Sequence, residues 1–167
     1  VIFDGEASFK TPKSILITSK NNVVKEISST NICIASGGRP REISGVPNSS
    51  NVWFYKEALQ VDNIPKKLLI VGSGAIGIEF ASFFAQMGSE VSVLESKPNI
   101  LPNEDLEVSN FVEKQFLNRG IKIYKNHTLL SLKQKGSIVE AELKCENKLL
   151  SLDFEKAILA VGIVGNI

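Results

Sequence analysis

The chain has 167 residues, of which 43% are hydrophobic, and a formal net charge of +1. This composition is that of a globular protein with one or two small cores, and the lack of a basic stripe argues against a nucleic-acid partner. No apolar stretch approaches the ~18 residues of a membrane span, and no signal peptide opens the sequence. Because the sequence starts at Val1 and stops directly after a strand and a glycine, we expect a piece of a longer polypeptide.

The first part of the chain is predicted to form short strands. Ser14–Thr18 and residues 23–27 flank Asn21-Asn22, a typical turn pair. Residues 32–35 are a continuous apolar run, which predicts a further strand. Residues 38–51 are rich in Gly, Pro, Ser and Asn, so we expect a loop and linker there, followed by a short helix near residues 53–60.

Residues 72–77 read Gly-Ser-Gly-Ala-Ile-Gly and have the surroundings of a dinucleotide fingerprint. The apolar residues 68–71 predict a buried strand before the glycines. Apolar residues then recur at helical spacing, which predicts a helix from Gly77 to Gly88. A second strand, residues 91–94, ends on Glu95. Strand, glycine turn, helix, strand and acid within about 30 residues indicate a dinucleotide-binding unit.

Each part of this motif has a physical role. Gly72 permits the tight turn, Gly74 lets a pyrophosphate approach the backbone, and Gly77 allows the helix to pack close to the sheet. The helix N-terminus offers N–H groups to the phosphates. Glu95 can accept hydrogen bonds from a ribose diol and would repel a 2′-phosphate, which favours NAD over NADP. The nearby cation Lys97 keeps NADP as the alternative.

The remainder predicts a helix over about 104–118 that ends at Gly120, a strand at 121–124 and then a β-meander. The residues expected along one face of this helix are Val108, Phe111, Val112, Gln115 and Phe116. Within the meander, Val139, Ala141, Leu143 and Cys145 alternate with charged residues, as in an antiparallel strand with one wet face. Residues 157–162 repeat the form of residues 32–37, an apolar strand ending in glycine. We therefore predict an α/β fold with two nucleotide-binding domains: the tail of a first domain and linker at 1–51, and a three-layer Rossmann-like domain at 52–167.

Other conspicuous residues are interpreted as structural. Cys33 and Cys145 are expected to be buried free thiols, and the aromatic set Phe80, Phe83 and Phe84 is expected in the core. The acids Glu104, Asp105 and Glu107 are expected to complement a helix dipole rather than to bind a metal. His127, the single histidine, matches no catalytic motif.

The sequence resembles the central part of the dihydrolipoamide dehydrogenase family, within the pyridine nucleotide–disulfide oxidoreductases. The most specific stretch is KKLLIVGSGAIGIEFASFFAQMGSEVSVLE at residues 66–95, followed by ILPNEDLEVSNF at 100–111. GEASF at residues 5–9, ASGGRP at 35–40 and AVGIVGN at 160–166 are similar to further family motifs. The resemblance covers essentially the whole chain.

This resemblance implies two cofactors, NAD and FAD, and roles for individual residues. The implied pyrophosphate contacts are Gly72, Ser73, Gly74, Ala75, Ile76 and Gly77. Glu95 would bind the adenosine ribose, Glu79 would lie near the nicotinamide, Leu129 near adenine, and Gly162 near the nicotinamide. The implied FAD contacts are Ala7, Ala35, Ser36 and Gly37.

The resemblance also implies a reaction and partners. The intact enzyme would pass electrons from dihydrolipoamide through a redox disulfide and FAD to NAD⁺. It would be a homodimer serving a 2-oxo-acid dehydrogenase complex or the lipoyl protein of glycine cleavage, in the cytoplasm or, for a eukaryotic source, the mitochondrial matrix. Two positions depart from the family pattern: Ile163 replaces an Arg and Gly165 replaces a Pro.

The family's C-x-x-x-x-C pair, His-Glu base and first glycine motif do not occur in this sequence. We therefore predict no catalytic residues and no lipoamide oxidation by the chain alone. Two alternatives stay open: a truncated module or remnant that at most binds NAD(H), and a related NAD(P)H-dependent reductase such as glutathione or mercuric reductase.

Overall fold

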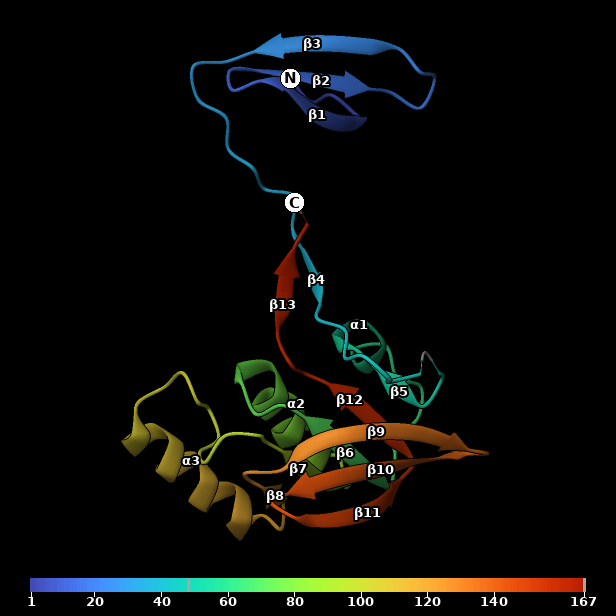
Figure 1. Cartoon of the computed structure of the whole chain (residues 1–167), viewed down its shortest axis with the longest axis vertical. Helices are drawn as coiled ribbons and strands as arrows, with labels where there is room; N and C mark the ends of the chain where they lie inside the picture. Colours follow the sequence, from blue (N-terminus) through green and yellow to red (C-terminus); the bar gives the residue numbers. More distant parts are fainter. Residues whose placement is uncertain (48, 167) are drawn as a thin grey trace. The chain divides into compact units, whose positions relative to one another are not determined.

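A computed structural model describes residues 1–47 and 49–166, which divide into two compact units, residues 1–37 and 38–166 (Figure 1). The first unit is a three-stranded antiparallel sheet of order β1-β2-β3. Its strands are β1 (Glu6–Thr11), β2 (Ser14–Thr18) and β3 (Val24–Ser28). The two strands predicted on either side of Asn21-Asn22 are confirmed, and Asn22 takes the left-handed conformation of a turn, with φ 59°.

The strand predicted at residues 32–35 is wrong. Residues 31–37 have no regular secondary structure, Ile34 is 60% exposed, and Cys33 is an exposed thiol rather than a buried one. A continuous apolar run forms a buried strand only if other layers cover both of its faces. Within the described part of the first unit, no strand pairs with this run.

The second unit is built around a five-stranded sheet of order β5-β12-β6-β7-β8, in which every neighbouring pair is parallel. The strands are β5 (Val52–Trp53), β6 (Lys67–Val71), β7 (Glu90–Leu94), β8 (Lys122–Tyr124) and β12 (Lys156–Leu159). The helices are α1 (Tyr55–Ala58), α2 (Ala75–Gln86) and α3 (Leu106–Asn118).

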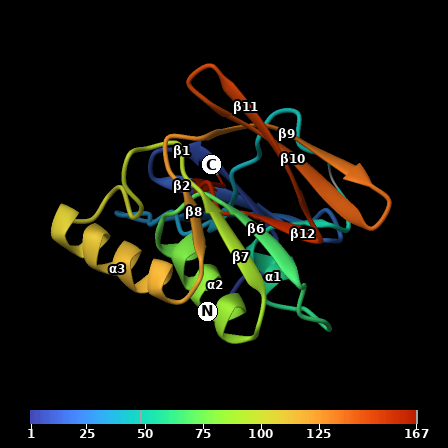
Figure 2. The same ribbon diagram turned by 90° about the horizontal axis from the view of Figure 1, so that it is seen from below.

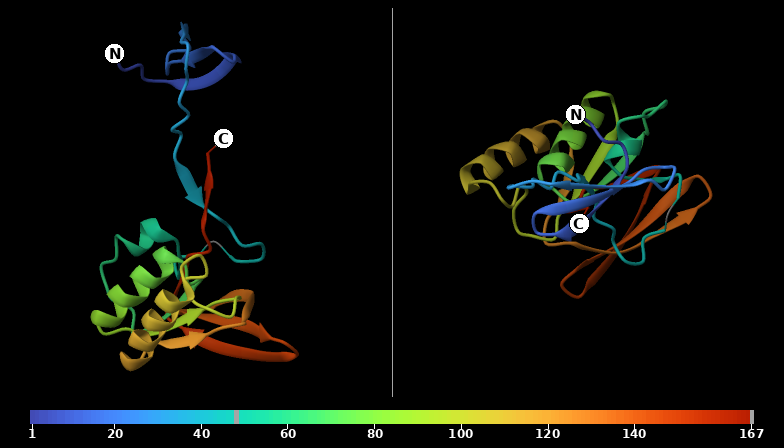
Figure 3. Two further views of the ribbon diagram at one scale, coloured as in Figure 1. Left: turned by 90° about the vertical axis from the view of Figure 1, so that its left-hand side faces the viewer. Right: turned by 90° about the horizontal axis from the view of Figure 1, so that it is seen from above.

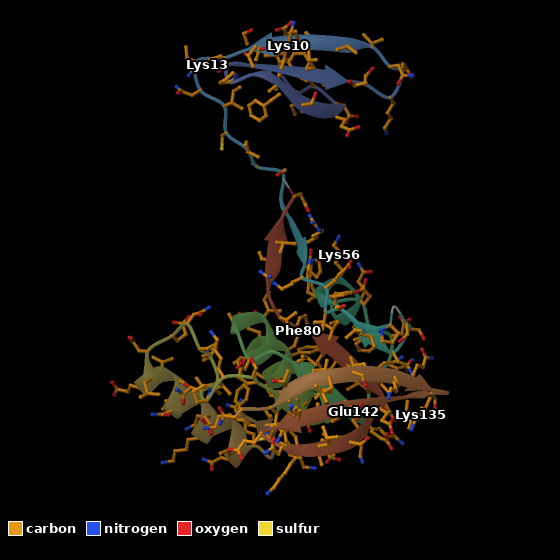
Figure 4. All side chains as sticks on the ribbon, viewed as in Figure 1. Lys10, Lys13, Lys56, Phe80, Lys135 and Glu142 are labelled. Carbon is orange, nitrogen blue, oxygen red and sulfur yellow. The ribbon has the colours of Figure 1, made fainter. Side chains whose placement is uncertain are left out.

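An antiparallel meander of order β11-β10-β9 forms the third layer, opposite the helices (Figure 2). Its strands are β9 (Thr128–Lys135), β10 (Ile138–Cys145) and β11 (Lys148–Phe154). As predicted, Val139, Ala141 and Leu143 of β10 are fully buried, whereas Cys145 is only partly buried. The charged face of β10 carries ion pairs such as Lys135–Glu140, at 2.6 Å, and contains Glu142 (Figure 4).

Alternation along the parallel strands explains the three layers. Successive side chains of a strand point to opposite faces, so an apolar run such as β6 can bury both faces. Leu68 and Ile70 join one buried cluster with Phe84 of α2, and Leu69 and Val71 join a second cluster with residues of the meander. The predicted three-layer α/β fold of Rossmann-like type is therefore present in this unit.

A further strand pair was not expected from the sequence. Residues 38–40, predicted as loop, form β4 (Gly38–Pro40), which pairs antiparallel with β13 (Ile163–Gly165) (Figure 3). The Arg39 guanidinium donates to the carbonyl of Gly165 at 3.2 Å. The two positions that depart from the family pattern, Ile163 and Gly165, thus lie in a strand, with Ile163 opposite Pro40.

The two long helices were predicted to within about two residues at their N-termini, but their apolar faces were predicted less well. On α2, Phe84 is fully buried and Phe80 partly buried, whereas Phe83 is 49% exposed. On α3, Phe116 is 5% exposed, but Phe111, expected on the same face, is 64% exposed. Apolar residues surround most of α2, so their periodicity alone does not select one buried face.

Candidate functional site

A cleft of about 560 Å³ lies at the carboxyl ends of β6, β7 and β12. In the sheet order, the chain runs from β6 to β7 and β8 on one side, while β12 lies on the other. This reversal is the switch point at which open α/β sheets bind ligands. The residues lining the cleft on these three ends are Val71 to Ile76, Leu94 to Lys97, and Ala160 to Gly162.

The glycine turn after β6 is packed so tightly that two of its residues have no room for a side chain. A Cβ on Gly72 would lie 2.5 Å from the carbonyl oxygen of Ala160, and φ at Gly72 is +99°. A Cβ on Gly77 would lie 2.0 Å from the carbonyl oxygen of Gly72. Gly77 therefore lets α2 approach the turn and the sheet closely, as predicted from the sequence.

Gly74 is different because a Cβ there would meet nothing within 4 Å. Gly74 is the N-cap of α2, in extended conformation, so the helix begins at Ala75 rather than at Gly77 as predicted. No side chain caps this end of the helix, and no acidic residue lies in its first turn. The helix N-terminus therefore presents its partial positive charge and N–H groups to open space in the cleft, a suitable environment for an anion.

Glu95 follows β7 and faces the glycine turn. It is only 7% exposed, and its carboxylate accepts four hydrogen bonds. Oε2 accepts from the backbone N–H of Ser73 at 3.1 Å and from the Ser73 hydroxyl at 2.6 Å. Oε1 accepts from the backbone N–H of Lys97 at 2.8 Å and from the Ser96 hydroxyl at 3.2 Å.

These contacts keep Glu95 ionised. Burial raises the pKa of the carboxyl group, but hydrogen bonds from Ser73, Lys97 and Ser96 outweigh the burial and leave the pKa below its usual value. The cleft therefore holds both a negative charge, on Glu95, and the N-terminus of α2. A ligand with a hydrogen-bond-donating group and a separate anionic group would match these two features.

The cleft brings together most of the residues predicted to bind NAD. Gly72, Ser73, Gly74, Ala75, Ile76, Glu95, Leu129 and Gly162 line it. Gly77 lies beneath the turn and is buried. Glu79, predicted near the nicotinamide, is exposed on α2 and is not among the lining residues. Its role stays a prediction.

The residues predicted to contact FAD all belong to the first unit. Ala7 is an exposed residue of β1, and Ala35, Ser36 and Gly37 lie in the segment without regular structure. A cavity in this unit is lined by Thr11, Lys13, Ser14 and residues 28–30, and none of the four predicted residues is among them. The roles of these four residues toward FAD stay a prediction.

Sequence reasoning gave no role to His127, yet this residue lines the cleft beside Leu129. Its Nδ1 lies 2.6 Å from the carbonyl oxygen of Lys125, and its backbone N–H donates to the carbonyl of Glu95 at 3.0 Å. A carbonyl can only accept, so Nδ1 carries the proton and Nε2 is left as an acceptor in the neutral ring. No motif could have revealed this, because His127 reaches the cleft through the pairing of its loop with the end of β7.

The fold places this unit in the class of Rossmann-like α/β folds. The whole chain belongs to the pyridine nucleotide–disulphide oxidoreductase family, whose sequence model matches residues 4–167. The chain is 39% identical over 168 residues to a dihydrolipoyl dehydrogenase of Zymomonas mobilis, covering 99% of this chain and 36% of that protein. It is 37% identical over 179 residues to one of Rhizobium etli, covering 98% and 37%. The chain thus spans little more than a third of these relatives.

Solved structures agree with this assignment. The flavoprotein disulfide reductase RclA of Escherichia coli superposes with a TM-score of 0.78 at 27% identity, covering 96% of this chain and 36% of that one. LpdA of Mycobacterium tuberculosis superposes with a TM-score of 0.83 at 26% identity, covering 97% and 36%. The predicted family and fold are therefore confirmed. The described residues contain no helix long and apolar enough to cross a membrane.

Proposed function

We propose that residues 52–167 form an NAD(H)-binding domain and that residues 1–51 are the tail and linker of an FAD-binding domain. One observation carries the first part of this proposal. At the switch point of the parallel sheet, the glycine turn and the N-terminus of α2 face the same cleft as the ionised Glu95. These groups match a pyrophosphate and a ribose diol.

The groups of the cleft suit NAD in detail. Open space over Gly74 leaves room for phosphate oxygens next to the backbone, and the helix N-terminus stabilises their charge. Leu129 supplies an apolar surface for adenine, and Gly162, which has no side chain, leaves the backbone accessible where it lines the cleft. When bound, NAD⁺ would supply the hydride acceptor of the reaction, and the residues of the chain would bind and orient it.

Glu95 favours NAD(H) over NADP(H). A 2′-phosphate would carry its charge next to an ionised and largely buried carboxylate, where charge repulsion is strong because water screens it poorly. Lys97 supplies the competing cation. Its backbone N–H donates to Glu95 Oε1, and the residue is exposed. Exposed charges are screened by water and salt, so the carboxylate dominates.

For the whole protein we propose dihydrolipoyl dehydrogenase, which would oxidise dihydrolipoamide through a redox disulfide and FAD to NAD⁺. The support is the 31–39% identity to proteins of that name across most of this chain. Lipoyl proteins of 2-oxo-acid dehydrogenase complexes or of glycine cleavage would be its partners, and the whole protein would be a homodimer. Because the sequence has no C-x-x-x-x-C pair, this chain alone would bind nucleotide without oxidising dihydrolipoamide.

The flavoprotein disulfide reductase RclA supports one alternative, since its structure superposes on 96% of this chain. Such a reductase could differ in nicotinamide cofactor and in the molecule it reduces. Cofactor preference distinguishes the alternatives: a preference for NADPH would exclude our assignment of Glu95 and would favour a different reductase.

Calorimetric titration of this chain with NADH and NADPH tests the proposal. We expect NADH to bind more tightly, and Glu95→Ala to weaken NADH binding by about ten-fold or more, the usual effect of losing charged hydrogen bonds. Asp62→Ala is a matched control, because it removes an exposed acid that precedes the amino end of β6. Equal affinity of the wild-type chain and Glu95→Ala for NADH, or tighter binding of NADPH, would contradict the proposal.

A further inference from the structure

The Glu95 carboxylate has no acceptor position left over. An ionised carboxylate offers about four lone-pair sites, two on each oxygen. In this structure each oxygen already accepts two hydrogen bonds from the chain itself. A ribose diol brings hydroxyl donors, so it needs one of these sites to become available. One of the four donors must therefore move when a nucleotide binds through its ribose.

The four donors differ in how firmly they are held. Ser73 is fully buried, and both its backbone N–H and its hydroxyl donate to Oε2. The N–H of Lys97 belongs to the backbone and lies 2.8 Å from Oε1. The Ser96 hydroxyl forms the longest of the four bonds, at 3.2 Å, and Ser96 is an exposed residue whose hydroxyl can turn to water.

Resting on the proposed function, we propose that the Ser96 hydroxyl occupies the site on Oε1 that a ribose hydroxyl takes when the nucleotide binds. We assign Ser73 the opposite role: it is a positioning residue that holds Glu95 from the buried side. The ligand chemistry is that of a vicinal diol on a nucleotide ribose. Ser96 would compete with the ligand, and Ser73 would support it.

The position of Ser73 in the chain adds to this assignment. Ser73 lies between the first two glycines of the turn, where the sequence suggested a pyrophosphate contact. Its hydroxyl instead donates to Glu95 at 2.6 Å, and its carbonyl accepts from the backbone N–H of Leu101 at 2.9 Å. Ser73 therefore ties the glycine turn to the end of β7 and to the loop before α3, so that the phosphate and ribose sites keep a fixed separation.

Two matched variants test the proposal, because Ser96→Ala and Ser73→Ala each remove one hydroxyl from the same carboxylate. Measured by calorimetry, Ser96→Ala should tighten NADH binding by about three-fold, and Ser73→Ala should weaken it by about five-fold, as expected for one hydrogen bond. The affinity for NADPH should not increase in Ser96→Ala, because NADPH carries a 2′-phosphate in place of one hydroxyl of the diol and the Glu95 carboxylate still repels that phosphate. Weaker NADH binding in Ser96→Ala, or no change in both variants, would overturn the proposal.

A second measurement needs no nucleotide. The titration of the Glu95 side-chain carboxyl, followed by NMR, should show a larger upward shift of its pKa in Ser73→Ala than in Ser96→Ala. Equal shifts would overturn the assignment of Ser73. If the wild-type chain fails to bind NADH while the two pKa shifts differ as expected, the proposed function fails. The assignment of Ser73 as the residue that holds Glu95 more firmly than Ser96 does would still stand. If Ser73→Ala does not fold, Ser96→Ala, which changes an exposed residue, still decides whether the Ser96 hydroxyl competes with the ligand.

Discussion

The two units use apolar residues in different ways. In residues 38–166 the sheet buries both faces, with Phe84 and Ile70 fully inaccessible on the helix side. In residues 1–37 every residue of β1 is exposed, Phe9 is 55% exposed, and among the described residues of this unit only Ile17 is a buried hydrophobic. The two units therefore differ in how far their apolar residues are buried. The second unit can hold a defined cleft, whereas the strands of the first unit are held mainly by backbone pairing.

The largest expected effect contrasts one phenylalanine from each unit. Phe84→Ala should lower the free energy of unfolding by about 3–5 kcal/mol, because it empties a fully buried site between α2 and the sheet. Phe9→Ala should change it by less than about 0.5 kcal/mol, since its side chain already contacts solvent. Urea unfolding of both variants measures the difference. A loss in Phe9→Ala as large as in Phe84→Ala would break the comparison.

A smaller effect contrasts two glycines within the second unit. Gly77→Ala should destabilise the fold by about 2 kcal/mol, because the new Cβ would overlap the carbonyl oxygen of Gly72. Gly74→Ala should cost less than about 1 kcal/mol, since it changes only an N-cap in open space, yet it should weaken NADH binding. Thermal unfolding and calorimetry together separate the two effects. Full NADH affinity in Gly74→Ala would mean that no phosphate lies at this turn.

The smallest effect concerns pH. The folded-state pKa of Glu95 is lowered, so Glu95 stabilises the fold above its unfolded pKa of about 4.3, and this contribution is lost as the pH falls through the lower folded value. Between pH 5 and 3, the wild-type chain should therefore lose more stability than Glu95→Gln. The pKa of Glu26 in the first unit is also lowered, mainly by its hydrogen bond to Lys10, but this exposed pair should matter little.

Unfolding followed at several pH values measures this, with Glu26→Gln as the matched control in the other unit. The control should keep the pH dependence of the wild-type chain, and 1 M salt should leave the Glu95 effect largely in place while it screens the exposed pair. A stronger pH effect in Glu26→Gln than in Glu95→Gln would reverse the expected order of the two units.

The sequence predicted the second unit well because short stretches of sequence determine its glycine turn and its main strands. Glycine spacing fixed the turn, and the apolar run of β6 and the alternation in β10 determined which faces are buried. The same reasoning failed at residues 32–35, where an equally apolar run is exposed because burial depends on layers elsewhere in the fold. It also failed for Phe83 and Phe111, since helical spacing does not say which apolar residues meet the sheet.

The site was predictable in its members but not in its contacts. The sequence predicted that Glu95 and the glycine turn would bind one ligand, and the structure places them in one cleft. It did not show that Ser73 bonds to Glu95, because the two residues are brought together only by the parallel pairing of β6 and β7. The entry of His127 into the cleft likewise depends on the loop after β8, whose backbone bonds to Glu95.

The central claim is that the cleft of the second unit binds NAD(H) through the glycine turn and Glu95. A crystal structure of this chain grown with NADH tests it most directly. We predict the pyrophosphate next to Gly74 at the N-terminus of α2, and a ribose hydroxyl within hydrogen-bond distance of Glu95 Oε1. Nucleotide bound elsewhere on the chain, or in this cleft with its ribose away from Glu95, would contradict the account.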